Sequence, residues 1–193
     1  MKRLVIITVG KTHSGKTTFA RTLEKEVPNS FVMDQDNQAE FINTYYDKLQ
    51  PTVGPNTLKH GLSKFIVDYA KEYTNLHFII CNSNRSRNGR MYLLNELFKK
   101  EEYVRILVHF DIPDDVLYER MNRSKRNTNI FRGNYSSFKE VLNRQQDESL
   151  HEDVIAPVEN EADYLFVIRN SKDVNSTIEE IVHLAEDLSL TSK

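Results

Sequence analysis

The residues with the clearest chemistry in this sequence are Gly-Lys-Thr-His-Ser-Gly-Lys-Thr at positions 10–17. Their spacing, G-x-x-x-x-G-K-T, lets the backbone curl around an anion so that its N–H groups point inward. In such a loop Lys16 reaches the β- and γ-phosphates of a nucleoside triphosphate, and the hydroxyl of Thr17 binds Mg²⁺. We therefore predict that ATP and Mg²⁺ bind here; the alternative is a glycine-containing turn without a ligand. The residues expected to hold the nucleotide are Gly10, Lys11, Thr12, His13, Ser14, Gly15, Lys16, Thr17 and Thr18.

Two aspartates follow the next apolar run of the sequence, at positions 31–33. Asp36 is the candidate general base, because a carboxylate there can accept the proton of a hydroxyl that attacks the γ-phosphate. The alternative is that Asp36 caps a helix near residues 37–46. Asp34 is more typical of a turn or a helix cap than of a catalytic residue.

Residues 120–132 contain five cations and no acidic residue. In a kinase such a segment forms a lid, because its arginines close over ATP and offset the charge of the transferring phosphoryl group. We expect Arg123 and Arg126 to act in catalysis in this way, and Arg120 to contact the nucleotide. Two alternatives stay open: a solvated loop of charged residues, and a patch that binds the phosphates of a nucleic acid.

These residues need a scaffold, and short β-branched runs alternate with helical patterns along the chain. That alternation is typical of a parallel sheet with helices on both faces. We predict strands at 4–9, 31–33, 76–81, 104–110 and 164–168. We predict helices at 16–26, 55–73, 89–99, 114–121, 136–149 and 176–188. The phosphate loop resembles that of the P-loop nucleoside-triphosphate hydrolases, and this resemblance implies their α/β fold, with a five-stranded parallel sheet in the order 2-3-1-4-5. We expect the chain to form one domain over residues 1–193, with a small lid at about 120–135.

The ends of the predicted strands carry polar residues. Ligands of parallel sheets bind beyond the carboxyl ends of the strands. We therefore expect the clusters at 34–36 and 82–84, together with Asp111, to converge on the rim that holds the triphosphate.

The pattern at 55–73 repeats apolar residues at helical spacing. We expect this face to pack in the core rather than to line a ligand site. Its members are Leu58, Leu62, Phe65, Ile66 and Tyr69.

Composition limits the remaining classes of function. The net charge of −2 argues against a protein that binds nucleic acid or membranes with its whole surface. Cys81 is the only cysteine, which excludes an internal disulfide, and its apolar surroundings suggest a buried, reduced thiol.

The apolar stretch at the start of the sequence ends at Val9, directly before the phosphate-binding loop, so we interpret it as a strand and not as a secretion signal. No apolar segment approaches the roughly 20 residues that span a bilayer, and we expect a cytoplasmic protein.

Together these residues resemble the P-loop kinases of the polynucleotide 5′-kinase and zeta-toxin type, which have AAA-like ATP-binding domains. The resemblance extends over residues 1–150, and beyond the loop at 10–17 it aligns Asp36 with the family's catalytic aspartate. It implies that ATP donates a phosphoryl group to a hydroxyl of a small molecule, a nucleotide or the 5′ end of a nucleic acid. The other matching segments are Asn82-Ser83-Asn84 with Gly89-Arg90, Phe110-Asp111-Ile112-Pro113, and Arg123-Ser124-Lys125-Arg126 in the lid.

Two positions depart from the pattern of that family. Asn82 stands where the family has an aspartate, so a metal-linked role of that carboxylate is lost. Ala39 stands where the family has an arginine for a substrate phosphate, which makes a nucleic-acid acceptor a less favoured reading. The alternative function is an ATP-binding regulatory protein with little or no kinase turnover. A GTPase is disfavoured because the sequence has no N-K-x-D segment for guanine.

Overall fold

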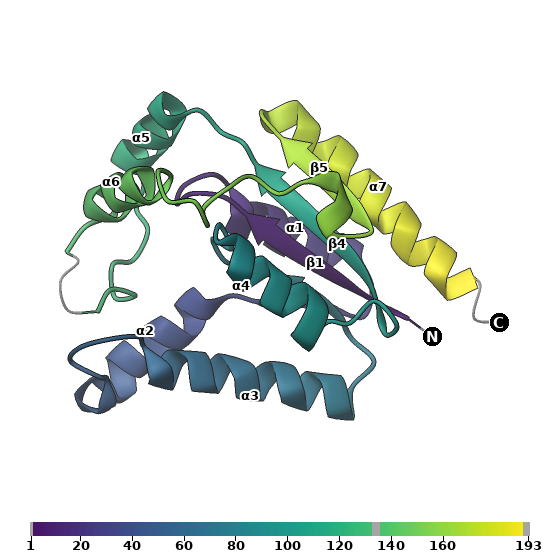
Figure 1. Cartoon of the computed structure of the whole chain (residues 1–193), viewed down its shortest axis with the longest axis horizontal. Coiled ribbons are helices and arrows are strands. Elements are labelled where there is room, and N and C mark those ends of the chain that lie inside the picture. The colour runs from purple at the N-terminus through teal and green to yellow at the C-terminus, as the bar shows by residue number, and fades with distance from the viewer. Residues whose placement is uncertain (1, 133–135, 191–193) are drawn as a thin grey trace.

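The computed structural model describes residues 2–132 and 136–190, and its centre is one parallel β-sheet (Figure 1). The strands lie side by side in the order β2-β3-β1-β4-β5, and every neighbouring pair is parallel. This is the predicted fold and strand order. The strands are β1 (Arg3–Val9), β2 (Ser30–Met33), β3 (His77–Ile80), β4 (Tyr103–Phe110) and β5 (Tyr164–Ile168).

Helices connect the strands and cover both faces of the sheet (Figure 1). They are α1 (Lys16–Glu26), α2 (Gln35–Tyr45), α3 (Thr57–Tyr73), α4 (Arg87–Tyr92), α5 (Asp114–Arg123), α6 (Phe138–Glu148) and α7 (Ser171–Leu190). Helix α4 continues as a π-helical turn over Leu93–Leu97, and short 3₁₀ turns lie at Asp47–Leu49 and Glu159–Glu161.

Strand β1 explains why the sheet needs helices on both sides. Leu4 and Ile6 pack into an apolar cluster with α1, α5, α6 and α7, whereas Val5 and Ile7 pack into a second cluster with α3 and the turn after α4. All four side chains are fully buried. A strand that is buried on both faces is apolar at consecutive positions and not at alternate ones, which is the pattern of this segment.

The predicted core face of helix 55–73 is wrong in part. Phe65 and Tyr69 are 66% and 54% exposed, while the buried residues of α3 are Ser63, Val67 and Ala70. Helical spacing identifies a stripe but not which of two adjacent stripes faces the sheet. The stripe with the smaller side chains packs inward here, and α3 therefore presents an aromatic row to the surface.

Several helices begin where a side chain satisfies the first N–H groups, and not where their apolar pattern begins. Asp34 accepts a hydrogen bond from the N–H of Asp36 at 3.0 Å, so α2 begins at Gln35. Asn56 accepts one from the N–H of Lys59 at 3.2 Å, so α3 begins two residues later than predicted. The cap of α2 is thus Asp34, and the alternative reading of Asp36 as the cap is wrong.

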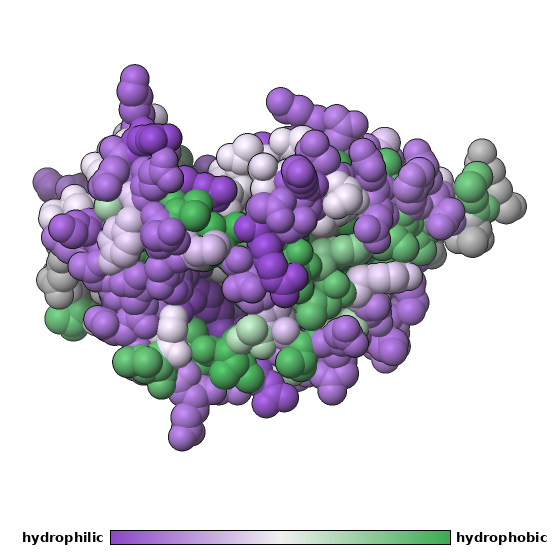
Figure 2. Space-filling model, turned by 90° about the horizontal axis from the view of Figure 1, so that it is seen from above, coloured by the Kyte–Doolittle hydropathy of each residue, from purple (hydrophilic) through white to green (hydrophobic). Residues whose placement is uncertain are grey.

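The surface of the molecule is mainly hydrophilic in the view from above, with hydrophobic residues gathered in the lower part of that view (Figure 2). Within the described ranges, none of the helices has the length and apolar character needed to cross a membrane.

Candidate functional site

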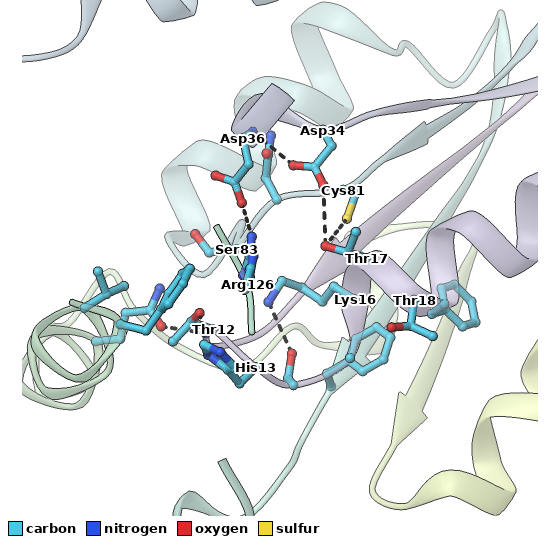
Figure 3. Close-up of a pocket in the computed structure, with 18 of the residues that line it drawn as sticks. Thr12, His13, Lys16, Thr17, Thr18, Asp34, Asp36, Cys81, Ser83 and Arg126 are labelled. Carbon is cyan, nitrogen blue, oxygen red and sulfur yellow. Dashed lines mark hydrogen bonds and ion pairs between the residues drawn. The ribbon is translucent and has the colours of Figure 1, made fainter. Parts of the chain in front are cut away.

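A cavity of about 900 Å³ lies at the carboxyl ends of the central strands. The loop at 10–17, the residues that follow β2, the start of α3 and the first turns of α6 contribute to its wall. Asp34, Asp36, Asn82 and Ser83 line it, as predicted for strand ends. Asn84 and Asp111 do not: Asn84 donates to the carbonyl of Thr8 at 2.9 Å, and Asp111 forms an ion pair with Arg169 at 3.4 Å. Figure 3 shows the residues of this cavity that converge around Lys16.

The backbone of the loop at 10–17, the phosphate loop, already has the curled form that an anion requires. Gly10 and Gly15 have φ angles of 153° and 104°, which side-chain-bearing residues rarely adopt. A Cβ on Gly10 would lie 3.0 Å from the Cβ of Phe110. The N–H of Gly10 donates to the carbonyl of Ser83 at 2.9 Å, which joins the loop to the end of β3.

Lys16 lies inside the curl of this loop (Figure 3). Its Nζ donates to the carbonyl oxygen of Lys11 at 2.5 Å and to Oγ of Ser14 at 3.2 Å. Burial lowers the pKa of Lys16 to about 8, so the side chain is cationic at neutral pH but close to losing its proton.

Thr17 and Asp34 face one another beside the lysine. Thr17 Oγ1 donates to Asp34 Oδ2 at 3.4 Å, and the thiol of Cys81 lies 3.7 Å from the same hydroxyl. Burial raises the pKa of Asp34, and the neighbouring charge of Asp36 raises it further. A hydroxyl and a carboxylate are oxygen ligands of the kind that Mg²⁺ prefers, so these two residues fit the predicted metal ion. Asp34 was predicted as a turn or capping residue within a cluster at the rim; its Oδ1 caps α2 and its Oδ2 faces Thr17 in the site.

Cys81 is buried and free, and burial raises the pKa of its thiol to about 11. It is therefore a neutral thiol at physiological pH, as expected from its apolar run.

Asp36 projects from the first turn of α2 into the cavity. Its carboxylate pairs with the guanidinium of Arg126, which comes from the segment after α5 (Figure 3). The guanidinium of Arg126 also lies 5.0 Å from the ring centre of Phe138. The structure thus brings together three predicted site residues, Lys16, Asp36 and Arg126.

The other predicted arginines have different positions. Arg120 lines the cavity and donates to the carbonyl of Ser14 at 3.1 Å, so it is attached to the phosphate loop. Arg123 pairs with Glu119 at 2.8 Å, its side chain is 79% exposed, and it does not line the cavity. Both residues belong to α5, which extends two residues beyond its predicted end.

The residues after α5, at 124–132, are here called the lid segment; positions 133–135 of the predicted lid lie outside the described residues. This segment is attached to α2. The Nδ2 of Asn43 donates to the carbonyls of Asn129 and Phe131 at 2.7 and 2.8 Å, and Asn127 donates to Glu40 at 2.6 Å. The contacts of the lid segment thus lie mainly on the α2 side of the cavity.

Helix α6 meets the phosphate loop through contacts that sequence analysis missed. Gln145 Oε1 accepts a hydrogen bond from the N–H of Thr12 at 2.7 Å. The rings of His13 and Phe138 meet edge to face, with centres 4.8 Å apart. Burial lowers the pKa of His13 to about 4, so this imidazole is neutral at physiological pH. More than 120 residues separate each pair in the sequence, and no motif marks Gln145 or Phe138.

The segment after β3 has a structural role in this chain. Asn82 Oδ1 accepts a hydrogen bond from the N–H of Gln35 at 3.2 Å and so holds the start of α2. Arg90 is fully buried and pairs with Glu161 at 2.7 Å, away from the cavity. Within the described residues, no cluster of three or more histidine, cysteine or acidic side chains is arranged to hold a metal ion.

Comparison with known proteins agrees with this architecture. A family model described as "AAA domain" matches residues 5–148. No curated protein sequence matches the chain. Shikimate kinase from Bacteroides thetaiotaomicron has a similar structure, with a TM-score of 0.56 and 16% identity over 95% of this chain and 98% of that one.

Two further solved structures resemble the chain. A gluconokinase from Sinorhizobium meliloti 1021 has a TM-score of 0.58 and 14% identity, with full coverage of both chains. The APS kinase CysC from Mycobacterium tuberculosis, solved with AMPPNP and APS, has a TM-score of 0.58 and 13% identity over 96% of this chain and 98% of that one. These likenesses are likenesses of fold. They do not single out the polynucleotide kinase and zeta-toxin type, which stays a prediction.

Proposed function

The chain belongs to the AAA domain family, and we propose that it is an ATP-dependent kinase that transfers the γ-phosphate of ATP to a hydroxyl group of a second molecule. The observation that carries this proposal is the position of Asp36. Its carboxylate lies in the cavity that Lys16 and the phosphate loop also line, where it can meet an acceptor hydroxyl. The similar structures named shikimate kinase, gluconokinase and APS kinase support the same class of reaction.

The proposed reaction uses the described residues as follows. The N–H groups of the phosphate loop and Lys16 bind the β- and γ-phosphates, and Arg120 contacts the nucleotide. Asp36 accepts the proton of the acceptor hydroxyl as its oxygen bonds to the γ-phosphorus. The bond between that phosphorus and the β–γ bridging oxygen breaks, and ADP leaves. Bound Mg²⁺, held by Thr17 with Asp34 beside it, would neutralise charge on the phosphate oxygens.

The lid segment has a proposed part in this reaction. Arg126 exchanges its contact with Asp36 for the γ-phosphate, which frees the carboxylate to act as a base and brings a cation to the transferring group. Arg123 joins it only if the end of α5 moves toward the cavity, since its present partner is Glu119. We propose that the whole chain, residues 1–193, is one kinase-like domain with its lid at about 120–135.

The experiment that tests the proposal is the substitution Asp36→Asn. Asn keeps the shape of the side chain but cannot accept a proton, so we expect turnover to fall about 10²- to 10⁴-fold while ATP affinity changes little. Release of ADP is measured with a panel of small hydroxyl compounds, nucleosides and 5′-hydroxyl oligonucleotides. Asp68→Asn, a substitution on the outer face of α3, is the matched control and should keep full turnover.

A second candidate function is an ATP-binding regulator with little or no turnover. The amide of Asn82, bonded to the N–H of Gln35, favours this alternative because it replaces a carboxylate of the resembling kinases. Under this function, ATP binds but no compound of the panel increases ADP release, and Asp36→Asn leaves ATP binding and the residual hydrolysis unchanged.

A further inference from the structure

We propose that the acceptor molecule carries an anionic group, a phosphate or a carboxylate, and that Lys59 and Arg132 bind this group. The inference rests on the kinase function proposed above and names the class of acceptor. It follows from a set of cations in the same cavity that the nucleotide site does not use.

Lys59 lies in the first turn of α3, where it lines the cavity together with Asn56. The side chain is half-buried, and burial lowers its pKa even though the charge of Asp36 acts in the opposite direction. Among the described residues, no hydrogen bond or ion pair is made by its Nζ. Burial of an ammonium group without a partner is unfavourable, and the binding of an anion removes that penalty.

The other lysines that are withdrawn from solvent do have partners. Lys11 pairs with Asp114 at 2.6 Å, and Lys71 donates to the carbonyl of Leu97 at 2.6 Å. Lys59 differs from them because its Nζ makes no ion pair or hydrogen bond among the described residues, although the carboxylates of Asp34 and Asp36 line the same cavity and favour its charged form.

Arg132 adds a fixed positive charge to the same wall. Its guanidinium donates to the carbonyls of Pro51 at 2.9 Å and Gly54 at 2.6 Å, which hold it in place without neutralising it. The positive charge of Arg132 lowers the pKa of Lys59 and contributes to the lowered pKa of His60. An anion between Lys59 and Arg132 would therefore meet two cations that repel one another in its absence.

Asp36 lines the same cavity as Lys59, Arg132 and the phosphate loop. The charges of Asp36 and Asp34 favour the cationic form of both Lys16 and Lys59, whereas Arg126 opposes it at Lys16, and Arg132 and Arg144 oppose it at Lys59. An acceptor held by its anionic group at Lys59 can therefore place a hydroxyl at Asp36 and face the γ-phosphate at Lys16. In this proposal Lys16 and Arg126 serve the donor, Lys59 and Arg132 serve the acceptor, and Asp36, which acts on both lysines, is the base for the acceptor hydroxyl.

The test is binding of inorganic phosphate and, separately, of malonate to protein saturated with AMPPNP and Mg²⁺, at constant ionic strength. The melting temperature reports binding. We expect phosphate or malonate to raise it in the parent protein and in Lys64→Met. Lys59→Met should weaken binding of the anion about 10- to 150-fold, as expected for loss of a charged hydrogen bond. Lys64 is the matched control because it lies on α3, pairs with Asp68 and is remote from the cavity lining.

Two further measurements define the outcome. Lys59→Arg keeps the charge and should bind the anion. The increase in melting temperature on addition of AMPPNP alone should be equal in the parent, the Lys59 variants and Lys64→Met. The ligand that gives the larger response identifies the anionic group as phosphate or carboxylate. An equal anion response in Lys59→Met and Lys64→Met, or no response in the parent, would overturn the proposal.

These outcomes are separate from the failure of the kinase function. Anion binding at Lys59 is also measured in Lys16→Ala, in which the phosphate loop competes less for the probe. If the kinase function is wrong and the anion site is right, the parent protein and Lys16→Ala both bind the anion, and the parent protein shows no turnover with any acceptor. If the anion site alone is wrong, turnover is found with neutral acceptors.

Discussion

At the scale of residues, Lys16 connects the electrostatics of the site to a measurable pH dependence. Its pKa of about 8 means that the free protein loses this charge above that pH, whereas the phosphates of ATP stay fully ionised. ATP affinity should therefore fall as the pH rises above 8, by at most about tenfold per unit. Lys16→Ala should bind ATP weakly and without this dependence, whereas Lys25→Ala on α1 should behave as the parent.

The lowered pKa of Lys16 also affects the stability of the protein without ATP, and here its effect is to increase stability as the pH rises. The ordinary pKa of lysine is 10.5, so the folded state binds fewer protons than the unfolded state between about pH 8 and 10.5. Cys81, whose thiol pKa is raised to about 11, acts in the opposite direction above about pH 9. The informative quantity is therefore the difference in the free energy of unfolding between the parent and Lys16→Ala, which should rise with pH across this window. Urea denaturation at several pH values measures it. A parent protein whose ATP affinity stays constant from pH 7 to 10 would contradict the role assigned to Lys16.

At the scale of elements, the attachment of the lid segment to α2 is the contact to test. Asn43→Ala removes two hydrogen bonds to backbone carbonyls, each worth about 0.5–1.5 kcal/mol. We expect faster hydrogen exchange in residues 124–132 of this variant, and partial protection on addition of AMPPNP, since Arg126 then gains phosphate contacts. Asn95→Ala on the turn after α4 is the control. Equal protection of these residues in every variant, with and without nucleotide, would show that the segment is no lid.

The elements also show how far the sequence could be interpreted. The strands and the phosphate loop were predictable because each depends on consecutive residues or on a local period, and the strand order followed from the P-loop fold that the loop motif indicates. The contacts of Gln145 with Thr12 and of Phe138 with His13 were not, because they join distant segments by tertiary packing alone. The buried face of α3 was misassigned for a related reason: its aromatic residues have the right spacing, but Ser63 and Ala70 allow the closer approach.

At the scale of the whole molecule, the ion pair of Arg90 and Glu161 joins the segment after β3 to the segment before β5. Both side chains are almost fully buried, and Arg90 also donates to the carbonyls of Asn84 and Arg85. The two segments belong to strands on opposite sides of β1 and β4 in the strand order, so this contact bridges the two sides of the sheet. A residue that the family resemblance placed near the chemistry thus joins the two sides of the sheet, away from the cavity.

Removal of Arg90 alone leaves the buried charge of Glu161 without compensation, whereas removal of both side chains leaves no buried charge. Arg90→Met should therefore lower the free energy of unfolding by about 3–5 kcal/mol, and Arg90→Met with Glu161→Leu should recover most of that loss. For a chain of this size the single variant should melt roughly 6–20 °C below the parent. Urea denaturation of the parent and of the single and double variants forms the complete cycle. If Arg90→Met costs less than about 1 kcal/mol, or if the double variant is no more stable than the single one, the pair does not join the two segments, and the fixed position of Asn84 needs another cause.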